Sequence, residues 1–312
     1  MLNRRLLRVK VFQALYGYFQ SEDADIVKGE KALFLSIDRV YQLYLHFLML
    51  PLEIAHIAQL QMEEAKGKVL PSKEDIEPNL KFIDGYVLKA LEGNHLLKKK
   101  ANDQQVSWVQ HQELLQRIWR KVKTSDFYSQ YINNEGADHR KFIIQLYQRY
   151  ILDNEDLYTQ FQEQSIYWDF EDCDFAINMA IRYFDKIKSE ELYKQLPAQY
   201  KDNEDDVLFV RDLYRKTIAN DADNTRFIEE KTKNWEVERI ALLDVILMKM
   251  AITEFLQFPS IPVKVTLNEY IELAKQFSSP KSKLFINGVL DKLLIEFKNN
   301  NQLKKSGRGL IQ

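Results

Sequence analysis

The stretch IPVKVTLNEYIELAKQFSSPKSKLFINGVLDKLL, residues 261–294, decides the fold, because two helices and the turn between them can be placed in it. Thr266 and Glu269 have the spacing of a capping box, which predicts a helix that begins near Thr266. Ser279 is a good N-cap and Pro280 suits the first position of a helix, so a second helix is expected directly afterwards. Its apolar positions recur at helical spacing: Phe285, Val289, Leu290, Leu293 and Phe297.

Helical periodicity continues upstream of this stretch. Val207–Ile218 and Arg239–Phe255 each predict a helix, and the second is apolar enough to lie in a core. Residues 3–20 predict a first helix with Asn3 as its N-cap. The apolar positions of this first helix are Leu6, Val9, Phe12, Leu15, Tyr16 and Phe19.

The composition favours an all-α fold. Of 312 residues, 46% are hydrophobic and 29% are charged, which is a normal globular balance. Gly (9) and Pro (7) are scarce, and long helices need fewer turn-forming residues than sheets do. The seven prolines all lie outside residues 79–196, so that stretch can be helical with short breaks.

Cysteine usage and hydropathy predict a cytoplasmic protein with no membrane association. A single cysteine, Cys173, excludes an internal disulfide, as is usual in a reducing compartment. The most apolar early segment, Val40–Ala58, is interrupted by Gln42, His46 and Glu53 among others, and no secretion signal is recognised at the N-terminus.

Positive charge gathers at the two ends, although the net charge is only −2. Residues 1–10 and residues 297–312 contain basic side chains and no acidic ones. This pattern suits contact with a polyanion at a local patch. For the second segment the alternative is a solvated, disordered tail. The basic residues are Arg4, Arg5, Arg8 and Lys10 at the start, and Lys298, Lys304, Lys305 and Arg308 at the end.

The middle of the chain contains a faint internal repeat. When residues 142–184 are shifted by 67 positions onto 209–251, Trp168 falls on Trp235 and several other apolar and aromatic positions match. Duplication of a helical unit explains this pattern. Two helix pairs with similar amphipathic patterns explain it equally well.

Signatures of catalysis are missing from the sequence. No glycine-rich phosphate loop occurs, and the five histidines lack the spacing of metal ligands on a helix. Cys173 has acidic neighbours, which raise a thiol pKa and disfavour a nucleophile. Asp205 and Asp206 are interpreted as solvated loop charges. We therefore expect no enzyme, no metal site and no cofactor.

Several segments resemble the NusB family of transcription antitermination factors. Ile261–Leu294 closely resembles the signature end of that family, and the N-terminal segment resembles its arginine-rich first helix. About 110 residues, divided between the two ends of the chain, carry the resemblance. The matching pieces are Asn3–Tyr16, Asp206–Tyr214, Leu243–Phe255, Val265–Glu269, Glu272–Lys275 and Phe285–Asp291.

The resemblance implies a long form of the family with a large internal insertion. The expected fold is all-α, with NusB-like helical bundles and a large additional helical region inserted after the first helix. The expected divisions are an N-terminal helix at 1–20, an insertion at 21–200 with a degenerate repeat at 138–196, a NusB-like core at 201–298, and a basic flexible tail at 299–312.

The same resemblance implies an RNA-binding antitermination factor. Such a factor acts with NusE, a ribosomal protein of the small subunit, on the single-stranded boxA element of ribosomal RNA transcripts, within the RNA polymerase antitermination complex. Tyr16 and Asp244 match positions associated with NusE. The positions that the resemblance assigns to RNA are Arg4, Arg5, Arg8, Lys10, Gln13, Ser279, Lys281, Ser282, Lys283 and Phe285.

Alternatives remain for single residues and for the whole chain. Phe285 and Tyr16 also suit core positions, and Asn268 and Asn287 also suit caps or buried hydrogen bonds. A helical interaction scaffold without RNA binding fits the acidic body and the long insertion. An RNA cytosine methyltransferase with a NusB-like domain would need an α/β domain and catalytic cysteines, and this chain has one cysteine.

Overall fold

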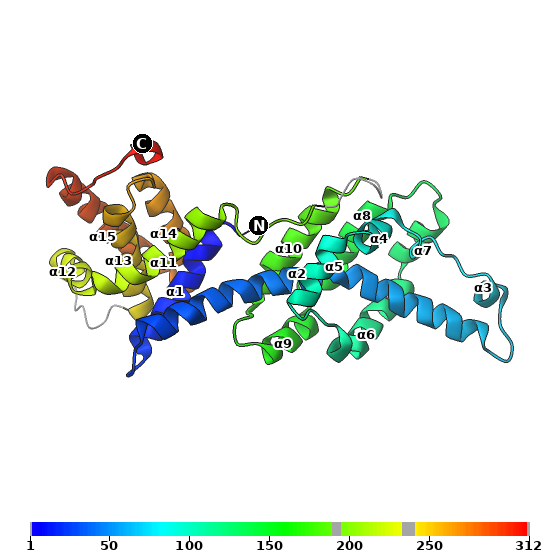
Figure 1. Ribbon diagram of the computed structural model, residues 1–312. Coiled ribbons are helices and arrows are strands. Elements are labelled where there is room, and N and C mark those ends of the chain that lie inside the picture. The colour runs from blue at the N-terminus through cyan, green and yellow to red at the C-terminus, as the bar shows by residue number, and fades with distance from the viewer. Residues whose placement is uncertain (1, 189–194, 233–240, 311–312) are drawn as a thin grey trace. The chain divides into compact units, whose positions relative to one another are not determined.

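The computed structural model describes residues 2–188, 195–232 and 241–310, and the regular structure in these ranges is helical (Figure 1). No strand occurs in the described ranges, so the predicted all-α class is confirmed. The chain forms two compact units. Unit 1 contains Met1–Ile37 and Gln199–Gln312, and unit 2 contains Asp38–Ala198. The division falls within the long helix α2 (Ile26–Lys66).

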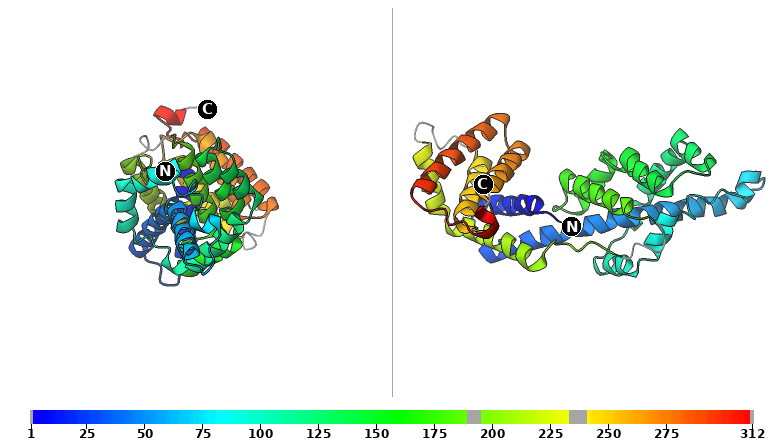
Figure 2. Two further views of the ribbon diagram at one scale, coloured as in Figure 1. Left: turned by 90° about the vertical axis from the view of Figure 1, so that its right-hand side faces the viewer. Right: turned by 90° about the horizontal axis from the view of Figure 1, so that it is seen from above.

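Unit 1 combines the beginning of the chain with its last third. Helix α1 contacts α11 and α13, and α13 contacts α11, α12, α14 and α15 (Figure 2). Segments that lie some 200 residues apart in the sequence therefore share one core. The helices are α1 (Arg4–Gln20), α11 (Asn203–Ala219), α12 (Asp221–Lys231), α13 (Leu242–Gln257), α14 (Val263–Phe277) and α15 (Pro280–Asn299).

Helix α13 is the central element of unit 1 because almost its whole circumference is buried. Its side chains from Ile246 to Phe255 are all inaccessible to solvent or nearly so. A helix that is apolar on every side is stable only when neighbours surround it. Three charged residues of α13 are buried as well, Asp244, Lys249 and Glu254, and the last two have oppositely charged partners.

Two of the predicted helix starts are confirmed and one is wrong. Asn3 caps α1 by accepting a hydrogen bond from the Leu6 N–H at 2.9 Å. Ser279 caps α15, with Pro280 at its first position. Helix α14, in contrast, begins at Val263, after Pro262. Thr266 therefore lies inside the helix, and its hydroxyl donates to Glu254 Oε1 at 2.8 Å instead of capping.

Unit 2 is a helical domain with an aromatic core. Trp108, Phe161 and Trp168 surround His46 with ring centroids 5.4–5.9 Å from its ring. The Trp108 indole donates to the His46 carbonyl at 3.1 Å. The helices beyond α2 are α3 (Lys73–Ile76), α4 (Tyr86–Glu92), α5 (His95–Asp103), η1 (Val109–His111), α6 (Gln112–Lys123), α7 (Asp126–Asn133), α8 (His139–Leu146), the π-helical η2 (Tyr147–Ile151), α9 (Glu155–Gln164) and α10 (Phe170–Asp185).

Helix α2 is long and apolar enough, by length and composition alone, to cross a membrane. About two thirds of its most apolar 18-residue window is buried within the structure. Core helices of soluble proteins pass the same test, so this feature is only a weak indication of a membrane span.

The helix boundaries follow the 67-residue shift of the sequence repeat. Helix α9, shifted by 67, corresponds to residues 222–231, and α12 spans Asp221–Lys231. Helix α8 with η2 corresponds in the same way to α11, and α10 to α13 within five residues. Trp235, the expected counterpart of Trp168, lies outside the described residues. The order and lengths of the helices agree with duplication and equally with two similar sets of helices, so the duplication stays a prediction.

Gly29 allows the start of α2 to approach α11 within unit 1. A Cβ atom at Gly29 would lie 2.1 Å from the hydroxyl of the buried Tyr214, whereas a Cβ at Gly17 would meet nothing within 4 Å. We expect Gly29→Ala to destabilise the protein by about 1–3 kcal/mol through overpacking. Gly17→Ala, on α1, should stabilise it by about 0.5–1 kcal/mol. Denaturant unfolding followed by circular dichroism measures both, and equal effects would contradict the close approach.

Two buried histidines make unit 2 sensitive to acid. Burial lowers the pKa of His46 and the pKa of His139 to about 4 in each case. Because an unfolded histidine titrates near 6.5, the unfolded chain takes up protons first as the pH falls. The free energy of unfolding should therefore decrease from about pH 6.5 down to about pH 4. His139→Gln should flatten this dependence in pH-resolved denaturant titrations, whereas substitution of the exposed His56 should not.

Candidate functional site

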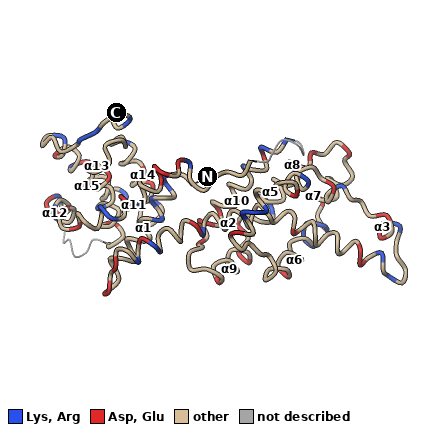
Figure 3. Tube along the Cα trace, in the orientation of Figure 1, with Lys and Arg blue, Asp and Glu red and all other residues tan. Residues whose placement is uncertain are grey.

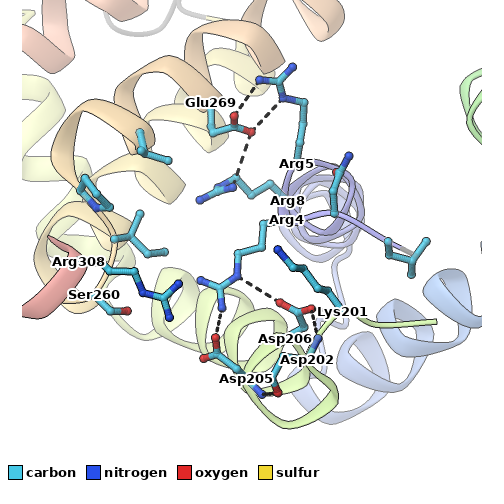
Figure 4. A pocket seen from close by; sticks show the side chains of 15 residues that line it. Arg4, Arg5, Arg8, Lys201, Asp202, Asp205, Asp206, Ser260, Glu269 and Arg308 are labelled. Atoms are coloured by element: carbon cyan, nitrogen blue, oxygen red, sulfur yellow. Dashed lines mark hydrogen bonds and ion pairs between the residues drawn. The ribbon is translucent and has the colours of Figure 1, made fainter. Parts of the chain in front are cut away.

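Three arginines of α1 are held by carboxylates from three different helices of unit 1, and Figure 4 shows the carboxylates of α11 and α14. Arg4 pairs with Asp205 and Asp206 at the start of α11. Arg5 makes two hydrogen bonds to Glu269 of α14, at 2.8 and 3.0 Å. The third arginine, Arg8, binds α13, so the basic side of α1 is fixed along its first two turns. The carboxylate partners of these three arginines are Asp205, Asp206, Glu254 and Glu269.

The pair of Arg8 and Glu254 is buried. Its two hydrogen bonds measure 2.7 and 2.8 Å, and the side chains are 3% and 0% exposed. Thr266 and Tyr270 donate to the same carboxylate at 2.8 and 3.2 Å. Burial alone would lower the pKa of Arg8, but the Glu254 carboxylate outweighs burial and raises it. The guanidinium is therefore charged and fully engaged.

The structure corrects the expectation that Arg8 and Lys10 contact RNA phosphates. Each residue is only 2% exposed. The helical wheel alone placed Arg8 off the apolar stripe, but Glu254 lies opposite that position in the folded unit. Arg8 therefore stabilises the docking of α1, and the α1 cations with solvent access are Arg4 at 31% and Arg5 at 49% side-chain exposure.

Asp206 is not the solvated loop residue that the sequence suggested. It lies in the first turn of α11 and is 4% exposed. Its carboxylate accepts hydrogen bonds from the backbone N–H groups of Lys201 and Asp202, both at 3.2 Å, and from Arg4. Asp206 thus joins the start of α11 to the start of α1.

A further basic segment, residues 279–285, surrounds the start of α15. The Ser279 hydroxyl accepts from the Ser282 N–H at 3.2 Å and thereby caps the helix. Lys281 is exposed, whereas Ser282, Lys283 and Phe285 are half-buried. The preceding Ser278 donates to the carboxylate of Asp244, which is 4% exposed. The buried Asp244 carboxylate therefore holds the turn between α14 and α15 in place.

Glu272 connects the two basic segments electrostatically. Its pKa is lowered by a hydrogen bond from Lys275 and by the positive charges of Arg5 and Lys283. One exposed carboxylate is thus close enough to respond to a residue of α1 and to a residue of α15. The rings of Phe12 and Phe277, 5.0 Å apart, hold α1 against the end of α14 beside them. Helix α14 contacts both elements, since its Glu269 pairs with Arg5 of α1 and the helix itself packs against α15.

The remaining assigned positions are spread over the same unit. Tyr16 is 41% exposed on α1, and Gln13 is half-buried. Asn268 is exposed, and the Asn287 amide donates to Asp291 at 2.9 Å. Neither asparagine is buried in the way that a core hydrogen bond would require.

A pocket of about 840 Å³ opens beside the arginines of α1. In Figure 4, side chains from the starts of α1 and α11, from α14 and from the C-terminal segment surround it. Figure 3 shows the same mixture of basic and acidic positions where α1 and α11 begin. The charged lining residues are Arg4, Arg5, Arg8, Lys201, Asp202, Asp205, Asp206, Glu269 and Arg308.

The described residues offer little for nucleophilic or metal chemistry. Cys173 is buried, and burial followed by the charge of Asp172 raises its thiol pKa, as the sequence predicted. No group of three or more histidine, cysteine or carboxylate side chains suited to a metal occurs among them. The chemistry available here is that of fixed cations and hydrogen-bond donors.

Sequence reasoning missed the carboxylates that hold α1. Glu254 is a single acidic residue near the end of a strongly apolar helix, and a buried charge of this kind requires a partner. That signal pointed to a basic partner without identifying it. Lys201 was missed, and Arg308 was named only as part of a basic tail, because only the folded unit brings their segments to the pocket.

We expect Arg8→Met to destabilise the protein by about 3–5 kcal/mol, because it leaves the Glu254 carboxylate buried and unpaired. Adding Glu254→Gln should recover much of this loss, since glutamine still accepts from Thr266 and Tyr270. Arg5→Met, at an exposed pair, serves as the control and should cost far less. Denaturant unfolding measures all four proteins, and an equal loss for Arg5→Met and Arg8→Met would contradict the assignment.

Comparison with known proteins gives one consistent family. The NusB family model matches residues 174–294. The transcription antitermination protein NusB of Salinibacter ruber is 43% identical over 103 residues, which are 33% of this chain and 64% of that protein. The protein of the same description from Chloroherpeton thalassium is 42% identical over 103 residues, 33% of this chain and 49% of that protein.

A third relative, NusB of Geotalea uraniireducens, is 42% identical over 85 residues, covering 27% of this chain and 59% of that protein. This chain thus spans less than two thirds of each of these relatives. No solved structure matches it. Unit 1 contains most of the matched residues, including the helices α11 to α14. Residues 174–294 of this chain are therefore similar to the NusB family.

Proposed function

We propose that this protein is a transcription antitermination factor that binds single-stranded RNA through unit 1. The match of the NusB family model to residues 174–294 carries the proposal, and the accessible cations Arg5 of α1 and Lys281 of α15 in the same unit support it. The curated relatives named above are transcription antitermination proteins. A phosphate backbone needs several fixed cations along its path, and α1 and α15 supply them from two directions.

The proposed RNA face contains backbone and base contacts. Arg5 and Lys281 are exposed cations for phosphates, and Lys283 and Phe285 are half-buried. The partly accessible ring of Phe285 provides a stacking surface for an unpaired base. Ser279 and Ser282 belong to this face through the α15 cap, and Gln13 through its position on α1.

The finer form of the proposal names boxA of ribosomal RNA transcripts as the RNA and NusE as the protein partner, within the RNA polymerase antitermination complex. Tyr16 presents an exposed ring on α1 for such a partner. Asp244, which is buried, contributes by holding the turn at Ser278 in place.

A second candidate function is a helical interaction scaffold without RNA binding. The observation that favours it is the engagement of Arg4, Arg5 and Arg8 with carboxylates, which reduces the positive charge available on α1. Salt-dependent RNA binding separates the two functions, because a scaffold would show none.

The test is fluorescence anisotropy of a boxA-type RNA oligonucleotide titrated with the full chain at several salt concentrations. Arg5→Ala with Lys283→Ala should weaken binding and reduce the salt slope by about 1.4, given about 0.7 for each contact to a single-stranded phosphate. Lys98→Ala with Lys99→Ala removes the same charge from exposed positions of α5 in unit 2 and is the matched control. Equal slopes for the two double variants would overturn the proposed face, and absence of salt-dependent binding by the unaltered chain would overturn RNA binding itself.

A further inference from the structure

The C-terminal segment is attached to unit 1 and carries a cation into the pocket beside α1. The sequence suggested a flexible tail, yet Lys305–Leu310, here called the C-terminal strap, makes specific contacts with the turn after α13. The Lys305 ammonium donates to the carbonyls of Phe258 and Glu254, at 2.9 and 3.3 Å. These carbonyls belong to the C-terminal end of α13, where a positive charge is favourable.

Two further contacts fix the part of the strap that follows Lys305. The Ser306 N–H donates to the Pro259 carbonyl at 3.0 Å. Gly309 is buried against the same carbonyl, and a Cβ atom there would lie 1.9 Å from the oxygen, so only glycine fits. Arg308 lies between these two fixed points and lines the pocket (Figure 4).

Arg308 and Lys201 differ from the other cations of this pocket. Arg4, Arg5 and Arg8 each pair with a carboxylate of the protein itself. Within the described part of the chain, the side chains of Arg308 and Lys201 form no ion pair. An anion that enters the pocket would therefore meet Arg308 and Lys201, which form no ion pair, beside α1 arginines that already have acidic partners.

We propose that the C-terminal strap presents Arg308, together with Lys201, as a binding site for a phosphodiester group of the RNA backbone. The proposal rests on the proposed RNA-binding function and adds a subsite supplied by the end of the chain. An arginine suits this role because its planar donors bind phosphate oxygens in pairs. The contacts of Lys305 and Gly309 hold the backbone in place beforehand, so less freedom is lost when the anion binds.

The alternative occupant is a carboxylate of an acidic protein partner. The pocket already contains four acidic lining residues, and they would repel an acidic peptide as much as a phosphate. The phosphodiester is favoured because the same α1 arginines border the proposed RNA face, so one backbone can pass from that face into the pocket.

The experiment measures salt-dependent binding of a boxA-type RNA oligonucleotide to the full chain, to three single variants and to one double variant. Arg308→Gln should reduce the salt slope by about 0.7, which corresponds to one single-stranded phosphate contact. Lys304→Gln is the matched control, since it removes an equal charge from an exposed neighbour that does not line the pocket. Gly309→Val keeps every charge but displaces the strap, and it should reproduce the Arg308→Gln effect without adding to it in the double variant.

A second readout separates this proposal from RNA binding as a whole. The Arg308 Nε–H signal in a ¹⁵N-correlated NMR spectrum, identified by its loss in Arg308→Gln, should shift when inorganic phosphate is added. If the unaltered chain binds RNA and Arg308→Gln behaves like Lys304→Gln, the strap subsite is overturned while the proposed function stands. If the unaltered chain fails to bind RNA but Arg308 responds to phosphate, the anion site stands and the RNA function falls. An acidic peptide that shifts the Arg308 signal when phosphate does not would identify a protein partner and overturn the proposal.

Discussion

The ion pair of Arg8 and Glu254 is the interaction on which unit 1 depends. It joins residues 246 positions apart, and it does so in an environment without solvent. A charge buried alone would cost several kcal/mol or more, so each partner requires the other. The surrounding donors of Thr266 and Tyr270 complete the coordination of the carboxylate. This contact sets the position of α1, and therefore the positions of the other residues on that helix.

This constraint decides how the basic end of the chain can function. A basic helix without partners would present all its cations to any polyanion. In unit 1 the carboxylates of α11, α13 and α14 bind most of these cations. The exposed positive charge is therefore concentrated at a few side chains held in fixed positions. Fixed cations of this kind contribute orientation as well as attraction. The acidic residues around α1 therefore belong to the site as much as the arginines do.

The sequence predicted the fold class and several helix caps, because these depend on local chemistry that short segments carry. Asn3, Ser279 and Pro280 act where their side chains favour a helix start. Thr266 and Asp206 were misjudged for the opposite reason: the groups that bind them come from remote segments. The basic residues of α1 could be found from the sequence, but their division into buried and accessible ones required knowledge of α13. Helical periodicity describes one helix at a time and does not identify its neighbours.

The position of Arg8 and Glu254 in the chain also has a consequence during synthesis. Ribosomes add about 5–20 residues per second, so roughly 10–50 s pass between the appearance of the arginine and that of its partner. Throughout that interval α1 lacks the helix against which it packs, and unit 2, which ends at Ala198, is complete before Glu254 is made. The insertion therefore imposes an order of assembly in which the middle of the polypeptide can fold first and its beginning last. For some seconds the nascent protein exposes an unpaired arginine-rich end beside ribosomal RNA.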